Sequence, residues 1–215
     1  MSRLFLELEH HFSVPKNEKI EHIFYFYREL DDNVISLKRA FKEQRSTIDF
    51  KFSTYIADDF VDTLPRNSIV CFDDMQELFE KSKELQRQLW ALSSILCHHR
   101  QCYAFFISQS VQILRKNHKL NCIISQLSYV VLFRNILEGK SLRRFLNNLT
   151  IKMKSNMSLS DVYDKFIQNK KHSYLLICVS PRANKCTAFS NILLSEPGNM
   201  LSFHYQSDNE NSDYE

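Results

Sequence analysis

The feature that most constrains the fold is a repeated alternation of short apolar segments with longer segments of helical periodicity. The apolar segments are rich in Ile, Val, Phe and Tyr, and runs that are apolar at nearly every position are typical of strands covered on both faces. Between them, apolar residues recur three and four positions apart, as in helices that pack on a sheet. The sequence therefore predicts an α/β fold, with a mostly parallel sheet and helices on both faces. The predicted strands cover residues 23–27, 48–52, 69–72, 103–107, 129–133 and 174–179, with a weaker edge strand at 187–193, and the predicted helices cover 33–41, 75–96, 120–127, 142–149 and 159–167.

Length and charge distribution predict one folded domain followed by a polar tail. The chain has 215 residues, of which 44% are hydrophobic, so we expect a single core within residues 1–200. All Lys and Arg residues lie at or before Lys185, so the part before the tail is more basic than the net charge of +3 suggests. This charge is compatible with a polyanionic partner, although a basic solvated surface is its commoner cause. We expect residues 201–215 to form a disordered acidic tail.

No segment has the features of a secretory signal or of a membrane span, because charged residues interrupt every long apolar run. We therefore expect an intracellular protein, in the cytoplasm or nucleus, with no membrane partner. In that reducing environment the six cysteines are expected to be free thiols. Cys97, His98, His99 and Cys102 do not have the spacing of a common zinc site, and we expect the histidine pair to end the long helix before it.

A strand that ends in two carboxylates is the most informative segment. Residues 69–72 are Ile-Val-Cys-Phe, and Asp73 and Asp74 follow them directly before a predicted helix. This order is typical of a Walker B strand, because open α/β sheets bind ligands at the carboxyl ends of their strands. Asp73 could then hold Mg²⁺ through its water molecules, and Asp74 could polarise the water that attacks a γ-phosphate. The alternative is that Asp73 or Asp74 only caps the helix that begins near Met75.

The next predicted strand, residues 103–107, ends in the polar residues Ser108, Gln109 and Ser110. A polar side chain at the end of a strand beside Walker B can sense the γ-phosphate, and Gln109 is the candidate for this role. The alternative is that Gln109 only forms a turn after the strand.

A phosphate-binding loop of the form G-x-x-x-x-G-K-[ST] does not occur in the sequence. Such a loop needs glycine so that its backbone N–H groups can surround the phosphates, and the only glycines are Gly139 and Gly198. Gly139, Lys140 and Ser141 follow a predicted strand, but Arg134 occupies the position of the loop's first glycine. We therefore interpret this segment as a helix-capping turn, and we do not expect the chain to bind ATP.

The ordered set of these segments resembles the DNA-packaging ATPases of Maverick/Polinton elements and related double-stranded DNA viruses, in the FtsK/HerA-like branch of P-loop ATPases. The similar segments are the aromatic strand 23–27, the Walker B segment 69–75 with its Asp-Asp-Met ending, residues 98–110 with a His-His pair before an apolar strand, and residues 124–135, which end in Ser-Tyr-Val-Val-Leu-Phe-Arg-Asn. With residues 174–177 and 191–196, the resemblance extends from residue 2 to residue 198.

The resemblance implies a RecA-like domain that uses ATP and Mg²⁺ to move double-stranded DNA into a capsid, working as a homo-oligomeric ring and associating with virions. Asp73 would be the Mg²⁺ ligand, Asp74 the base and Gln109 the sensor. Arg134 or Arg100 would be a candidate for the arginine that reaches the nucleotide of a neighbouring subunit. Ile-Leu-Glu at 136–138 replaces the family's Pro-Arg-Asp, which leaves that arginine unassigned.

The resemblance also places the family's Walker A loop immediately before the first helix. Met1 stands about where the loop's lysine belongs, and Ser2 could be the Ser or Thr that follows it. We therefore expect the first strand and the P-loop to be missing and the chain as written to be inactive as an ATPase. We also expect an open sheet edge beside strands 69–72 and 103–107. The alternative function is that of a non-catalytic interaction protein, or a relic, derived from an integrated viral element.

Overall fold

The computed structural model describes residues 20–43, 48–99, 101–108, 126–133, 139–148, 158–165, 174–178, 187–190 and 201–204. The chain divides into two compact units, Met1–Ser125 and Gln126–Glu215. We predicted one domain over residues 1–200, whereas the strands after Gln126 pair with one another and do not extend the first sheet.

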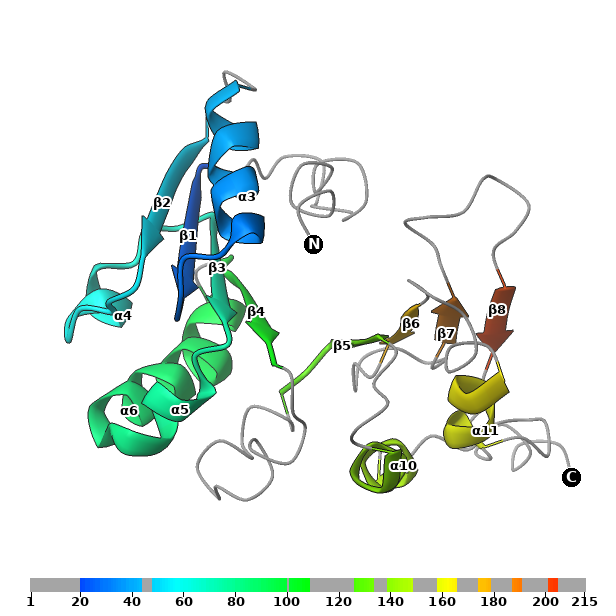
Figure 1. Ribbon diagram of the computed structural model, residues 1–215. Coiled ribbons are helices and arrows are strands. Elements are labelled where there is room, and N and C mark those ends of the chain that lie inside the picture. The colour runs from blue at the N-terminus through cyan, green and yellow to red at the C-terminus, as the bar shows by residue number, and fades with distance from the viewer. Residues whose placement is uncertain are drawn as a thin grey trace, which may run out of the picture. The chain divides into compact units, whose positions relative to one another are not determined.

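The first unit is built around a four-stranded parallel sheet with the order β2-β1-β3-β4 (Figure 1). Its strands are β1 (His22–Tyr27), β2 (Asp49–Ser53), β3 (Ser68–Asp73) and β4 (Tyr103–Ile107). Each strand begins and ends within one residue of the range predicted for it. The α/β class with a parallel sheet is therefore confirmed for this unit.

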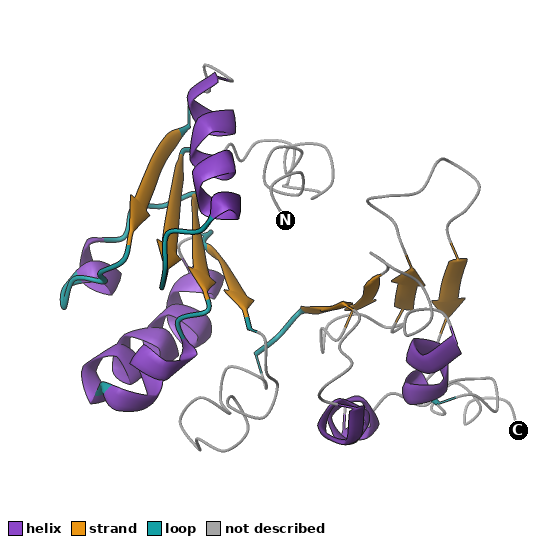
Figure 2. Ribbon diagram, in the orientation of Figure 1, coloured by secondary structure: helices purple, strands orange, loops and turns teal. Residues whose placement is uncertain are grey.

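Helix α3 (Asp32–Glu43) covers one face of this sheet (Figure 2). Its apolar residues Val34, Leu37 and Phe41 are spaced three and four positions apart and are buried, as the helical periodicity predicted. They join side chains from β1 and β3 in one core. The buried members of this core are Ile20, Ile23, Tyr25, Tyr27, Val34, Leu37, Phe41, Ile69 and Cys71.

Phenylalanine rings fill the opposite face of the sheet. Helices α4 (Phe60–Thr63), α5 (Gln76–Lys81) and α6 (Lys83–Ala91) follow β2 in the chain. The ring of Phe72 in β3 stacks between Phe26 and Phe106, with centroids 5.6 and 5.2 Å away, and Phe79 of α5 meets it edge-on at 5.2 Å. Because successive residues of a strand point to opposite faces, the neighbouring Asp73 faces the α3 side. Helices on both faces are thus confirmed.

The single helix predicted over residues 75–96 is interrupted at Ser82. The backbone of Ser82 is extended, and its hydroxyl oxygen accepts a hydrogen bond from the N–H of Leu85 as the N-cap of α6. Periodicity alone did not reveal this break, because the apolar pattern continues across it. Beyond α6 the chain continues as the π-helical turn η1 (Leu92–Leu96) and the short helix α7 (Cys97–His99).

The second unit contains a four-stranded antiparallel sheet with the order β5-β6-β7-β8. Strands β5 and β6, which we predicted as parts of one mostly parallel sheet, therefore belong to a separate antiparallel one. Strand β8 also lies within residues 201–215, for which we predicted a disordered tail. The elements of this unit are β5 (Tyr129–Phe133), α10 (Gly139–Asn148), α11 (Leu159–Tyr163), β6 (Tyr174–Cys178), β7 (Thr187–Ser190) and β8 (Leu201–His204).

Strand β5 is covered on one face only, whereas β3 of the first unit is buried along nearly its whole length. Val130 and Leu132 are buried, whereas Tyr129, Val131 and Phe133 are exposed. Such alternation is typical of an antiparallel strand with one covered face. All five residues are apolar, so the sequence pattern resembled that of a strand covered on both faces.

Of the two strands that we expected to border an open edge, only β4 lies at an edge of the first sheet. Strand β3 has hydrogen-bonded neighbours on both sides, β1 and β4. Within the described residues, β4 pairs only with β3. The expectation of an open edge beside both residues 69–72 and residues 103–107 is therefore corrected, because only β4 borders it.

Candidate functional site at the carboxyl ends of β1 and β3

The candidate site lies where the connections of the parallel sheet change direction. From β1 the chain passes through α3 to β2 on one side, and from β3 it passes through α5 and α6 to β4 on the other side. In open α/β sheets, ligands bind beside the carboxyl ends of the two strands at such a switch point. Here those ends are Tyr27 of β1 and Asp73 of β3, which are register partners.

Asp73 is held at this point by a tyrosine from the neighbouring strand. The hydroxyl of Tyr25 donates a hydrogen bond of 2.5 Å to Asp73 Oδ2. Burial raises the pKa of the Asp73 carboxyl, the hydrogen bond from Tyr25 lowers it, and the charges of Asp31 and Asp74 raise it further. Burial and the hydrogen bond to Asp73 together raise the pKa of Tyr25 strongly, so the phenol stays protonated as the donor.

Asp74 lies in a left-handed backbone conformation directly after β3. Its φ is 54°, a region that Asp tolerates better than most residues. Its N–H donates a hydrogen bond of 3.1 Å to the C=O of Ile107, which ties the carboxyl ends of β3 and β4 together. Its side chain accepts a hydrogen bond from the amide nitrogen of Gln76. The alternative role as a helix cap is not observed, since the N-cap of α5 is Met75 and no side chain caps it.

The loop after β1 adds further polar groups to the site. Asp31 accepts hydrogen bonds from the N–H of Val34 at 2.8 Å and from the Asn33 amide at 3.1 Å, and so caps α3. These bonds lower the pKa of Asp31. Arg28 and Glu77 form an ion pair of 3.1 Å between the end of β1 and helix α5, so the two sides of the switch point are joined by a second polar contact.

A cation also lies against the aromatic residues of this sheet face. Lys38 Nζ of α3 donates a hydrogen bond of 2.9 Å to the hydroxyl of Tyr27. The same Nζ lies 4.7 Å from the centroid of the Tyr27 ring and 5.1 Å from that of Phe52, within the range of cation–π attraction. Sequence reasoning missed Tyr25, Tyr27 and Lys38, because it assigned the aromatic strand to the core. The alternation along β1 was the available signal, since it places Tyr25 and Tyr27 on one face.

Of the predicted site residues, only Asp73 and Asp74 lie in the described part of the chain. Asp73 and Asp74 lie together at the carboxyl end of β3, and the predicted neighbour of this strand, β4, pairs with it in parallel. Four other predicted residues lie outside the described part of the chain. They are Ser2, Arg100, Gln109 and Arg134.

The described residues fit a Mg²⁺ site only of the kind that relies on one or two carboxylates and on water or phosphate oxygens. Asp73 and Asp74 could supply those carboxylates. Within the described ranges, no group of three or more His, Cys, Asp and Glu side chains could hold a metal ion. Cys71, Cys97 and Cys102 are free thiols, as predicted, and burial raises the pKa of Cys97 to about 12.

Comparisons with known proteins leave the family open: no family model, no curated protein and no solved structure matches this chain. Within the described residues, none of the helices has the length and apolar character needed to cross a membrane.

Proposed function

We propose that the chain is the Walker B part of a P-loop ATPase that moves double-stranded DNA, of the Maverick/Polinton packaging type. The observation that carries this proposal is the position of Asp73. It ends β3, a strand with parallel neighbours on both sides, and it lies at the switch point of the sheet with Asp74 next to it. This is where an open α/β sheet can offer carboxylates to a bound nucleotide.

The proposed roles of Asp73 and Asp74 fit their position at the carboxyl end of β3. Asp73 would hold Mg²⁺ through water molecules, and Asp74 would orient and polarise the attacking water. When bound, Mg²⁺ neutralises charge on the phosphate oxygens. By the sequence resemblance, Gln109, which follows β4 in the chain, would sense the γ-phosphate, and Arg134 or Arg100 would act on the nucleotide of a neighbouring subunit in a ring.

ATP binding also requires a P-loop, and the 215 residues contain no segment of that form. A further strand can pair in parallel with this sheet only at its two borders, β2 and β4. The border at β4 is adjacent to the carboxylates of β3, because the N–H of Asp74 binds the C=O of Ile107. We therefore infer that the chain does not hydrolyse ATP by itself and that a P-loop strand would join beside β4.

A second candidate function is that of a non-catalytic interaction protein derived from an integrated viral element. The hydrogen bond between Tyr25 and Asp73 favours it, since this bond occupies one oxygen of the carboxylate that would serve Mg²⁺. A sheet whose polar groups bind one another can persist as a structural unit after catalysis is lost.

The test begins with the transcript that encodes this chain and its upstream sequence. If an in-frame G-x-x-x-x-G-K segment is present, the full-length protein should hydrolyse ATP in a Mg²⁺-dependent manner. Asp73→Asn and Asp74→Asn should each abolish most of this activity, whereas Glu80→Gln, at an exposed position of α5, should retain it. Asn is chosen at position 74 because it tolerates the left-handed backbone. A transcript without this segment would support the non-catalytic function, and an active enzyme insensitive to both Asp variants would contradict the proposed roles.

A further inference from the structure

The second unit carries a basic helix surface that the proposed ATPase site does not use. Helix α10 (Gly139–Asn148) contains Lys140, Arg143 and Arg144 and no acidic residue. One face of this helix is packed into the second unit. The buried residues of that face are Leu142, Phe145 and Leu146.

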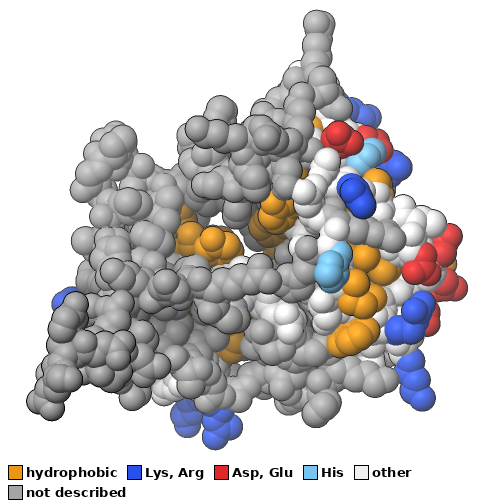
Figure 3. Space-filling model, turned by 180° about the vertical axis from the view of Figure 1, so that it is seen from behind, with side chains coloured by type: hydrophobic (Ala, Val, Ile, Leu, Met, Phe, Trp, Pro, Cys, Tyr) orange, Lys and Arg blue, Asp and Glu red, His pale blue; other side chains and the backbone are white. Residues whose placement is uncertain are grey.

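The opposite face of α10 is polar and exposed. At about 100° per residue, Lys140, Arg144 and Asn147 fall on the side of the helix directly opposite its buried residues, and all three are exposed. We call these three residues the outer stripe. Figure 3 shows Lys and Arg side chains gathered at the lower edge of the molecule in that view.

The positive charges of α10 differ in how they are neutralised. Arg143 Nη2 lies 2.6 Å from Oδ2 of Asp164, the residue that follows α11. Hydrogen bonds from the backbone and the side chain of Ser158 lower the pKa of the nearby Asp161, and the charge of Arg143 lowers it further. Within the described part of the chain, Lys140 and Arg144 have no ion pair or hydrogen bond. Within the described residues, the outer stripe is therefore a positively charged surface whose two cations are not paired with a carboxylate.

The third member of the outer stripe contributes a neutral donor. Asn147 Oδ1 accepts a hydrogen bond of 3.4 Å from the hydroxyl of Ser160 in α11. This contact uses the amide oxygen and leaves the NH₂ group to donate outward. Lys140 and Arg144 are separated by four residues, a rise of about 6 Å along the helix. The three side chains thus offer a row of donors and carry no negative charge that would repel an anion.

We propose that the outer stripe of α10 binds the phosphate backbone of duplex DNA. Lys, Arg and Asn side chains are the usual donors to phosphate oxygens in protein–DNA complexes, and such contacts need no particular base sequence. This inference rests on the proposed function for its choice of duplex DNA, and it adds the surface that would hold the substrate.

The chemistry of the stripe favours a duplex over other polyanions. It contains no aromatic side chain, so it offers no platform on which the bases of a single strand could stack. An amphipathic helix that binds a lipid surface needs apolar residues free to enter the membrane. The apolar residues of α10 are instead buried in the protein.

The experiment measures binding of the full 215-residue chain to a fluorescein-labelled 30-base-pair duplex by fluorescence anisotropy, between 50 and 200 mM KCl. Lys140→Gln combined with Arg144→Gln should weaken binding at least tenfold at 100 mM KCl. It should also reduce the slope of log K against log salt by about 1.8, because each lost phosphate contact contributes about 0.9. Lys140→Arg combined with Arg144→Lys should retain the binding.

The matched control is Arg39→Gln with Lys42→Gln, which removes two exposed charges from helix α3 of the first unit. It should change the affinity less than about threefold. Thermal melts should show that both double variants remain folded. Equal losses in the two double variants, an unchanged salt slope in the α10 variant, or no binding by the wild-type chain at 50 mM KCl would overturn the proposal. Tighter binding to phosphatidylserine vesicles than to the duplex would overturn it as well. No nucleotide is present, so these results are independent of the ATPase test.

Discussion

The hydroxyl of Tyr25 and the carboxylate of Asp73 form a hydrogen bond of 2.5 Å between the neighbouring strands β1 and β3. Their strands are in parallel register with Tyr27 opposite Asp73, so the tyrosine reaches along its strand by two residues to meet the carboxylate. Both groups lie on the face covered by α3, partly out of contact with water. A carboxylate in that position needs a donor, because burial without one is costly.

Tyr25→Phe should therefore lower the free energy of unfolding by about 1.5–3 kcal/mol, the usual contribution of a hydrogen bond to a charged group. Chemical denaturation of the purified chain at pH 7 would measure it. Tyr55→Phe is the matched control, since the Tyr55 side chain is 67% exposed and should change the stability very little. Equal stabilities of wild type and Tyr25→Phe would show that the bond contributes nothing at equilibrium.

Asp73→Asn should make the folded chain more stable at neutral pH. Burial raises the pKa of Asp73 in the folded state, so the folded state binds more protons than the unfolded state between the two pKa values. Stability from this group is fully present below the unfolded pKa and is lost as pH rises through the folded pKa. An asparagine cannot ionise and so avoids this loss.

The difference in unfolding free energy between Asp73→Asn and wild type should thus be smallest below about pH 4 and should grow in favour of the variant toward pH 7. Denaturation series at several pH values would measure it, and Glu80→Gln controls for the change in net charge. A wild-type chain that gains stability over the variant as pH rises would contradict the expected shift.

More of the structure could be predicted from the sequence in the first unit than in the second. In the first unit, strands covered on both faces are almost wholly apolar, so their positions and the two carboxylates after β3 could be predicted. The contact of Tyr25 with Asp73 could not, because it depends on which strand lies beside β3. In the second unit the apolar residues of β5 did not distinguish a covered face from an exposed one. Whether two strands pair in parallel or antiparallel depends on how the chain connects them, and the sequence of a single strand does not encode it.

The 215-residue chain should not bind Mg-ATP measurably. Backbone N–H groups of a glycine-rich loop and its lysine supply most of the contacts to nucleotide phosphates, and no such segment occurs in these residues. Isothermal titration calorimetry should show no binding tighter than about 100 μM, which corresponds to about 5.5 kcal/mol. A tighter complex that Asp73→Asn weakens would mean that the switch point binds nucleotide without a P-loop.

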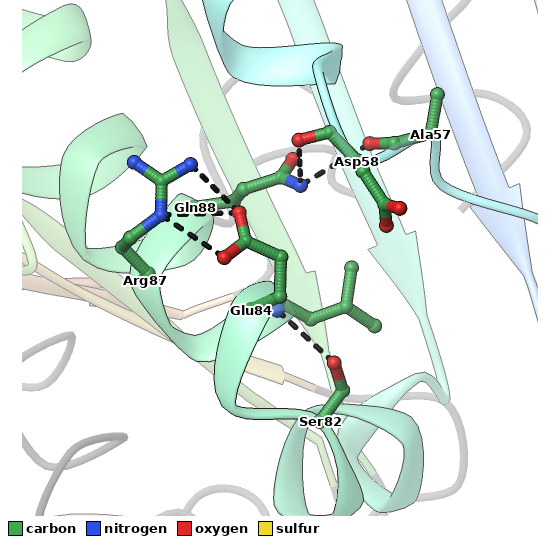
Figure 4. A network of polar contacts seen from close by, with 7 residues as sticks. Ala57, Asp58, Ser82, Glu84, Arg87 and Gln88 are labelled. Atoms are coloured by element: carbon green, nitrogen blue, oxygen red, sulfur yellow. Dashed lines mark hydrogen bonds and ion pairs between the residues drawn. The ribbon is translucent and has the colours of Figure 1, made fainter.

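Helix α6 is attached to the loop after β2 through one buried amide (Figure 4). Gln88 Nε2 donates hydrogen bonds to the C=O of Asp58 at 2.6 Å and of Ala57 at 3.2 Å. The Gln88 side chain is 3% exposed, and its Oε1 has no hydrogen-bond partner within the described residues. On the outer surface of the same helix, Arg87 and Glu84 form an exposed ion pair of 2.7 Å.

Gln88→Ala should lower the free energy of unfolding by about 2 kcal/mol, since it leaves two carbonyl groups without their donor and opens a cavity. Gln88→Leu fills much of that cavity and also removes the unpaired oxygen, so it should lose less. The difference between these variants separates packing from hydrogen bonding. Arg87→Gln is the surface control and should have little effect, because exposed ion pairs contribute little to stability. Denaturant midpoints of the four proteins would decide the matter: if Gln88→Leu matches wild type, the two hydrogen bonds are not what attaches α6 to the loop.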